Sequence, residues 1–139
     1  VNTYVSLAST VLASIAGISL LVSALMIIVT MYMSVSERTK EIGILRALGE
    51  RKKDIRRLFT SESVFIGLFS AILALLIVAV VTVIINHALY GLIKYNIVQI
   101  TVGNVIFAIV IAIVISFIAA LLPARRAANL NPIDALAAD

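Results

Sequence analysis

The sequence predicts an all-α integral membrane protein, with three transmembrane helices and a cytoplasmic amphipathic helix between the first two. Of its 139 residues, 63% are hydrophobic and only 13% are charged. A soluble chain this short could not bury so much apolar surface, because small domains leave a large part of their surface in water. The charges are also clustered. Eight of the eleven Lys and Arg residues and four of the seven acidic residues lie between Glu37 and Arg57, and the runs on either side are nearly free of charge.

Three uncharged runs are long enough to cross a bilayer, for which about 20 apolar residues in a helix suffice. The first run, residues 1–36, is longer than this, so we expect residues 1–10 to lie mostly outside the membrane. We expect Pro123 to end the third span, and Asn131 to cap a short terminal helix that begins at Pro132. The predicted spans are residues 11–33, 64–85 and 102–122.

The basic residues predict the orientation of the chain. Eight lie between the first two spans, one lies between the second and third, and two follow the third. Because Lys and Arg are retained on the cytoplasmic side, we expect segments 34–62 and 123–139 in the cytoplasm and the loop 86–101 outside. The segment would thus begin outside and end in the cytoplasm, as a multi-pass protein of the plasma or inner membrane.

All three spans carry small residues at helical spacing, including Ala13 and Gly17 in the first. Lipid provides no hydrophobic drive for helices to associate, so transmembrane helices pack through short side chains that let their backbones approach. In the second span the small residues begin with Ser63 and include Ser70. We expect two helix-packing faces, formed by Gly67, Ala71 and Ala74 in the second span and by Ala108, Ala112, Ser116 and Ala120 in the third.

The charged segment between the first two spans predicts a short amphipathic helix. Ser34 and Glu37 have the spacing of a capping box, in which each residue bonds a free backbone N–H at the helix start. Ile42, Leu45 and Leu48 then recur at helical spacing, and Ile44 widens this apolar stripe.

The opposite face of this helix holds Gly43 and Ala47, four residues apart, where another surface could come close. Gly49 suits the end of the helix, since glycine tolerates the left-handed conformation found there. A second short helix follows, with Ile55 and Phe59 on one face, and it is predicted to run into the second span.

Two interpretations of this amphipathic helix are open from its pattern. A basic helix between spans can simply lie on anionic lipid, where each Lys or Arg contributes about 1 kcal/mol near the surface. Alternatively, its apolar stripe can dock on a partner protein.

The residues themselves resemble a known family. The segment Ser36 to Gly49, SERTKEIGILRALG, followed by Lys53-Asp-Ile and later Glu62, is similar to the cytoplasmic signature of FtsX/MacB-type permeases, the membrane subunits of one class of ABC transporter. The resemblance continues in Pro123-Ala-Arg-Arg-Ala-Ala128 and Asn131-Pro-Ile-Asp-Ala-Leu136, which are similar to that family's closing motif. It covers roughly residues 15 to 137, so the whole chain, residues 1–139, resembles a single permease domain. Where the family commonly has glycine at Ser70, Ala71 and Ala74, this chain has small residues that are not glycine.

This resemblance implies a function and partners. The chain would be the permease subunit of an ABC transporter, paired with a second permease copy or a paralogue in the lipid bilayer, with a fourth span and an extracytoplasmic domain upstream. A separate ABC ATPase subunit would bind ATP and Mg and drive export or mechanotransmission. An alternative with the same architecture is a regulatory transducer that controls a cell-wall hydrolase or a sensor kinase. The resemblance assigns coupling to the ATPase to Glu37, Arg38, Glu41, Ile42, Leu45, Arg46, Leu48 and Gly49.

Other functions find no support in the sequence. It contains no G-x-x-x-x-G-K-[ST] or G-x-G-x-x-G motif for phosphates, no catalytic constellation and no cysteine. We therefore expect no enzymatic activity, bound cofactor or metal in this chain itself. The basic residues adjoin spans rather than a soluble face, which argues against nucleic-acid binding. His87 is expected at the outer interface. Glu62 is an interfacial acid at the mouth of the second span. An ionisable residue there can indicate a function, or it can simply offset the helix dipole and pair with Arg56, Arg57 or Arg125.

Overall fold

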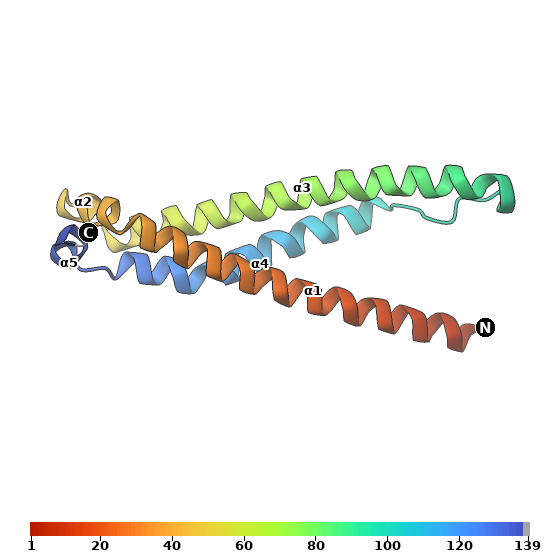
Figure 1. Cartoon of the computed structure of the whole chain (residues 1–139), viewed down its shortest axis with the longest axis horizontal. Helices are drawn as coiled ribbons and strands as arrows, with labels where there is room; N and C mark the ends of the chain where they lie inside the picture. The colour runs from red at the N-terminus through yellow and green to blue at the C-terminus, as the bar shows by residue number, and fades with distance from the viewer. Residues whose placement is uncertain (138–139) are drawn as a thin grey trace. The chain divides into compact units, whose positions relative to one another are not determined.

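The computed structural model describes residues 1–137, whose regular structure is entirely helical (Figure 1). Three of the helices are long and apolar enough to cross a membrane, and the short α2 lies between the first two in sequence. The predicted fold class is therefore confirmed. The helices are α1 (Asn2–Glu37), α2 (Thr39–Ala47), α3 (Lys52–Ile93), α4 (Val102–Ala128) and α5 (Pro132–Ala137).

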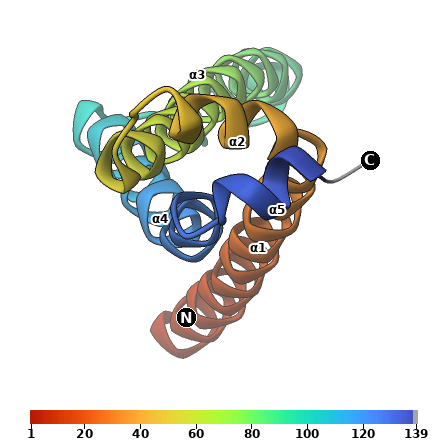
Figure 2. The same cartoon turned by 90° about the vertical axis from the view of Figure 1, so that its left-hand side faces the viewer.

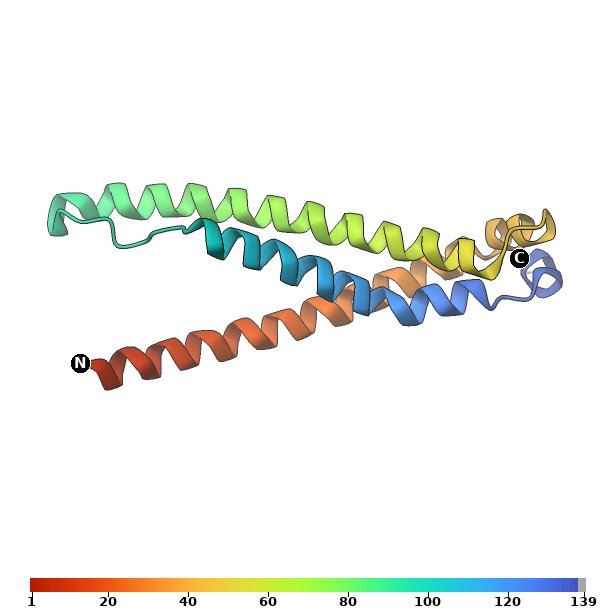
Figure 3. The same ribbon diagram turned by 180° about the vertical axis from the view of Figure 1, so that it is seen from behind.

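The chain divides into two compact units, which are described separately. The first unit contains Val1–Thr60 and the stretch from Ala119 onward, so it holds α1, α2, α5, the start of α3 and the end of α4. The second unit, Ser61–Ile118, holds the rest of α3, the connection that follows it and the first part of α4, which run side by side (Figure 3).

The predicted capping box at Ser34 is wrong, because α1 continues through this residue. The backbone N–H of Arg38 donates to the carbonyl oxygen of Ser34 at 3.0 Å, which is a bond within a helical turn. The helix breaks only at Arg38, and α2 begins there with no side-chain cap. Met31 and Val35 are buried near the end of α1, so tertiary packing explains why the helix extends past the local start signal.

Pro123, the predicted end of the third span, lies inside α4, which continues to Ala128. A proline inside a helix removes one backbone hydrogen bond and typically costs about 3 kcal/mol. Here the ring of Pro123 is fully buried, and so are Ala124, Ala127 and Ala128 in the turns that follow. Burial of these residues offsets the missing bond, and alanine is the strongest helix former.

Three predictions about where helices end, begin or continue are confirmed. Gly49 has a φ of 102° after α2, and the N–H groups of Gly49 and Glu50 donate to the carbonyls of Arg46 and Leu45 at 3.2 and 3.0 Å. This pair of bonds is the Schellman motif. At α5, the Oδ1 of Asn131 accepts from the N–H of Ile133 at 3.1 Å, as an N-cap does. The helix predicted after Gly49 runs into the second span as one helix, α3.

Candidate functional site

One apolar core in the first unit joins α2 to all three long helices. We call it the junction core, and its buried members are Met31, Val35, Ile42, Ile55, Phe59, Ala124 and Ala127. Ile27 and Leu130 pack against it. The first two residues belong to α1, Ile42 to α2, the next two to α3 and the alanines to α4. A displacement of α2 would therefore disturb the packing against all three long helices, because close-packed side chains have little room to yield.

Two arginines stack on aromatic rings around this core. The guanidinium carbon of Arg38 lies 5.3 Å from the centroid of the Phe59 ring, and that of Arg126 lies 5.3 Å from the Tyr32 ring. Both distances are within the range of a cation–π interaction, which contributes about 0.5–1 kcal/mol at an exposed site. The first of these contacts joins the break between α1 and α2 to α3. The second joins the end of α4 to α1.

The helix α2 packs side by side with α5. Figure 2 shows these two short helices at the front, viewed from the left-hand side of Figure 1. Gly43 is buried in this contact. A Cβ atom added to Gly43 would lie 2.8 Å from the Cβ of Ala135 and 3.2 Å from the backbone N of Leu136. The sequence predicted a low patch at Gly43 and Ala47 that another surface could approach. At Gly43 that surface is α5, whereas Ala47 is exposed.

The exposed side of α2 carries Glu41 and Ile44, and the C-cap residue Leu48 follows at the same helical spacing. We call these three residues the outer face of α2. The side chain of Ile44 is 45% exposed and that of Leu48 is 79% exposed. Both are large apolar residues set among charged ones, and neither belongs to a helix that could span a membrane. Exposed apolar residues of this kind can contact a protein partner or the membrane surface.

The eight residues assigned to ATPase coupling do not form one surface in this structure. Ile42 is buried in the junction core, so its side chain packs within the chain. Arg38, Leu45 and Arg46 are half-buried, and only the remaining four, Glu37, Glu41, Leu48 and Gly49, are exposed. Arg46 donates from one terminal nitrogen to the carbonyl of Glu50 at 3.2 Å, and its Nε is buried with no hydrogen-bond partner among the described residues. Ile44, which was expected only to widen the stripe, is part of the outer face.

In the second unit the two stripes of small residues meet. The Oγ of Ser63 donates to the carbonyl oxygen of Ser116 at 2.9 Å, and the Oγ of Ser116 donates to the carbonyl of Ala112 at 2.7 Å. A Cβ on Gly67 would lie 2.6 Å from the Cβ of Ser116 and 3.0 Å from the carbonyl oxygen of Ala112. The backbones of α3 and α4 therefore come close only because residue 67 has no side chain.

The other small residues assigned to helix packing differ in burial. Ala71 is buried in the second unit, and Ala120 is buried in the first unit. Ala74, Ala108 and Ser70 are exposed, so the described chain does not pack against them. Glu62 is half-buried and lines an open hollow of about 410 Å³ together with Phe65, Ile66, Phe69 and Ser70.

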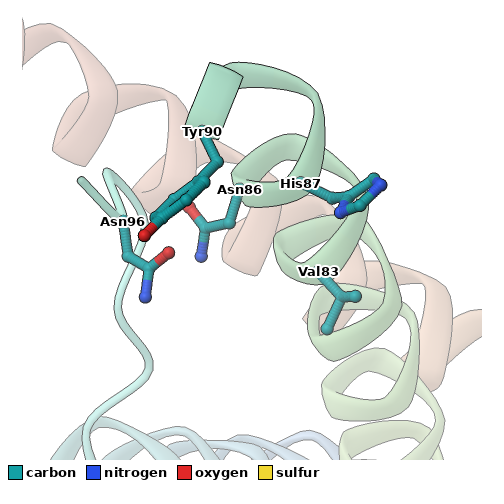
Figure 4. A pocket seen from close by; sticks show the side chains of 5 residues that line it. All are labelled: Val83, Asn86, His87, Tyr90 and Asn96. Carbon is teal, nitrogen blue, oxygen red and sulfur yellow. The ribbon is translucent and has the colours of Figure 1, made fainter. Parts of the chain in front are cut away.

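At the far end of α3, Asn86 holds the connection to α4. Its side-chain amide donates to the carbonyl oxygen of Val98 at 2.8 Å, and its Oδ1 accepts from the N–H of Val98 at 3.1 Å. Asn86, Tyr90 and Asn96 point toward one another around a hollow of about 340 Å³, whereas His87 points away from them (Figure 4). Asn86 was not predicted from the sequence. The signal that could have indicated it is an amide side chain at the end of an otherwise apolar run.

These observations define the class of protein first. Three long apolar helices, a charged segment between the first two and close-packed small residues describe a multi-pass helical membrane protein. In the described part of the chain no cluster of His, Asp or Glu side chains is arranged to hold a metal ion.

Comparison with known proteins identifies the family. Residues 13–132 match the family of the FtsX-like permease C-terminal domain, so the chain belongs to this family and the resemblance seen in its motifs is confirmed. It is 40% identical over 128 residues to an ABC transporter permease of Methanocaldococcus jannaschii, covering 88% of this chain and 31% of that protein. It is 38% identical over 128 residues to the macrolide export ATP-binding/permease protein MacB of Neisseria gonorrhoeae, covering 92% and 19%. It is 33% identical over 146 residues to the ABC transporter permease YtrF of Bacillus subtilis, covering 97% and 34%. The chain thus spans about a third or less of the length of these relatives.

Proposed function

We propose that this chain is the membrane-embedded C-terminal part of an ABC transporter permease. In this proposal an ATP-binding protein docks on the outer face of α2, and its closure on ATP moves α2. The junction core then passes that movement to α1, α3 and α4. The observation that carries the proposal is the composition of this core, in which Ile42 of α2 packs with buried residues from all three long helices.

The proposed partner is an ABC ATPase that binds ATP and Mg. The M. jannaschii and B. subtilis relatives are named permeases, whereas MacB is named an ATP-binding/permease protein. ATP binding is therefore a property of a separate subunit or of another part of the same chain. We propose a separate subunit, and a dimer with a second permease copy or a paralogue. Export or mechanotransmission would be the work of that complete assembly.

The docking role is tested by Leu48→Asp, which places a charge at the exposed apolar residue that caps the C-terminus of α2. A charge buried in an apolar interface without a partner is strongly destabilising, so association with the ATPase should fall about tenfold or more. The fold should survive, since the side chain of Leu48 is 79% exposed. The measurement is co-purification of the full-length permease with the ATP-binding subunit encoded with it, together with permease-stimulated ATP hydrolysis.

Leu92→Asp is the matched control for this experiment. Leu92 is 81% exposed at the other end of α3, so the same substitution there should leave ATPase association unchanged. The charge reversal Lys52→Glu with Lys53→Glu tests the alternative, in which α2 only rests on anionic lipid. That reversal should weaken lipid binding much more than docking. If Leu48→Asp retains full association and stimulation, the outer face of α2 is not the docking surface.

We also propose the orientation predicted by the basic residues. Segments 34–62 and 123–139 would face the cytoplasm and the loop 86–101 the outside, and residues 138 and 139 lie outside the described part of the chain. The chain has no native cysteine, so single cysteines at Lys53 and Lys94 report their own side of the membrane. An impermeant thiol reagent applied to intact cells should label only position 94. Labelling at position 53 would invert the proposed topology.

A further inference from the structure

We infer that α5 fixes the orientation of α2 through the contact of Gly43 with Ala135, which makes these two positioning residues. The inference rests on the proposed docking role of α2 and adds to it the means by which the outer face is presented. It also assigns a role to α5, the last helix of the described chain, which the docking proposal by itself does not need.

The contact leaves no room for a side chain on Gly43. An added Cβ would lie 2.8 Å from the Cβ of Ala135, 3.2 Å from the N of Leu136 and 3.3 Å from the carbonyl carbon of Ala135. Two of these three atoms are backbone atoms, which cannot rotate away as a flexible side chain can. Ala135 is itself buried, at 3% exposed. The backbones of α2 and α5 are therefore in direct contact at this point.

The position of Gly43 on α2 determines which side of the helix faces outward. Successive residues of an α-helix are turned by about 100° around its axis. Ile42 is packed in the junction core and its neighbour Gly43 is packed against α5. Two sides of α2, about 100° apart around its axis, are therefore in contact with the rest of the chain. Rotation of α2 about its axis is thereby prevented, and Ile44 and Leu48 are left on the exposed side.

α2 depends on such contacts because it is short. It has nine residues, and isolated helices of fewer than about 12 residues are marginal in water. α5 is itself anchored at its start by the Asn131 cap and by Leu130, which packs against the junction core. Through α5, the end of α4 therefore reaches α2 by a second route, separate from the contact of Ile42 in the core.

The test compares the same substitution at a buried and an exposed alanine of α5. In the full-length protein, Ala135→Leu should lower the amount of ATP-binding subunit retained on purification about tenfold, because overpacking at Gly43 displaces α5 and turns α2. Ala137→Leu, on the exposed side of α5, should stay within about twofold of the wild type. Gly43→Ala should act in the same direction as Ala135→Leu. Combining it with Ala135→Gly removes the closest clash and leaves the two tight backbone contacts, so the pair should recover part of the association that Gly43→Ala loses.

A disulfide between Gly43→Cys and Ala135→Cys measures the contact without any partner. The chain contains no other cysteine, and two Cβ atoms this close come within bonding reach after a small outward shift. We expect the bond to form on mild oxidation in membranes, and its formation reports the contact of α2 with α5 independently of association with the ATP-binding subunit.

Each outcome decides a different point. No disulfide would overturn the contact, and failure of the size swap to restore association would overturn the positioning role. Full association of Ala135→Leu alongside a formed disulfide would also overturn that role, while leaving docking through Leu48 intact. A wild-type protein that retains no ATP-binding subunit would overturn the proposed function and, with it, the docking part of this inference.

Discussion

Replacing Gly67 with leucine should separate α3 from α4 in the second unit. The leucine Cβ alone would lie 2.6 Å from the Cβ of Ser116 and 3.0 Å from the carbonyl oxygen of Ala112, so the clash is partly with backbone. Separation would also break the bond from Ser63 Oγ to the Ser116 carbonyl. Overpacking typically costs about 1–3 kcal/mol, and a hydrogen bond between transmembrane helices contributes about 0.6 kcal/mol on average. We expect a total loss on the order of 3 kcal/mol.

The measurement is thermal unfolding in detergent, with Gly91→Leu as the control. Gly91 lies in the same helix and an added Cβ there meets no atom within 4 Å, so its variant should unfold like the wild type. Ser116→Ala removes the bond from the Ser116 hydroxyl to the Ala112 carbonyl without adding bulk, keeps the bond from Ser63 to the Ser116 carbonyl, and should cost less than Gly67→Leu. Equal stability of the two leucine variants would show that α3 and α4 do not touch at Gly67.

Replacing Phe59 with alanine should release α2 from the long helices. Phe59 is completely buried in the junction core, and truncating a buried phenylalanine typically costs about 3–5 kcal/mol. The ring also stacks on Arg38, whose cation–π contact adds about 0.5–1 kcal/mol. We expect α2 to lose its fixed position while the transmembrane parts of the long helices remain inserted.

Hydrogen exchange of the backbone amides of residues 39–47 measures this release directly. Local unfolding raises the exchange of the affected segment alone, so protection should fall in α2 and persist in the spans. Phe69→Ala provides the control, since Phe69 lies on the same helix but is 77% exposed. Unchanged protection of α2 in Phe59→Ala would mean that the junction core does not hold this helix, and the proposed route of coupling would then be wrong.

The two experiments address different parts of the molecule. Gly67 concerns packing of the second unit, and Phe59 concerns the first unit, where α2 meets the long helices. If the proposed function is correct, Phe59→Ala should reduce permease-stimulated ATP hydrolysis together with the protection of α2. Leu48→Asp should reduce the first and leave the second unchanged, which separates loss of docking from loss of the junction core.

The sequence by itself determined the elements whose cause is local. Three uncharged runs of sufficient length specify three apolar helices, because in lipid each backbone polar group must be bonded within its own helix. Gly49 specified the end of α2 and Asn131 the start of α5, because each effect needs only a few neighbouring residues. The family could also be recognised from the sequence, since its motifs lie in two continuous segments.

The tertiary structure alone decided which faces are covered. Helical periodicity indicated a stripe through Ile42, Leu45 and Leu48, but α5 covers Gly43 and the junction core covers Ile42, so Ile44 and Leu48 are the exposed apolar residues. Burial likewise carried α4 past Pro123, and it carried α1 past Ser34, where a local signal predicted the start of a new helix. In each case the deciding contact joins residues that are distant in sequence. A local pattern can indicate that a helix has an apolar face, but it cannot indicate which part of the chain packs against that face.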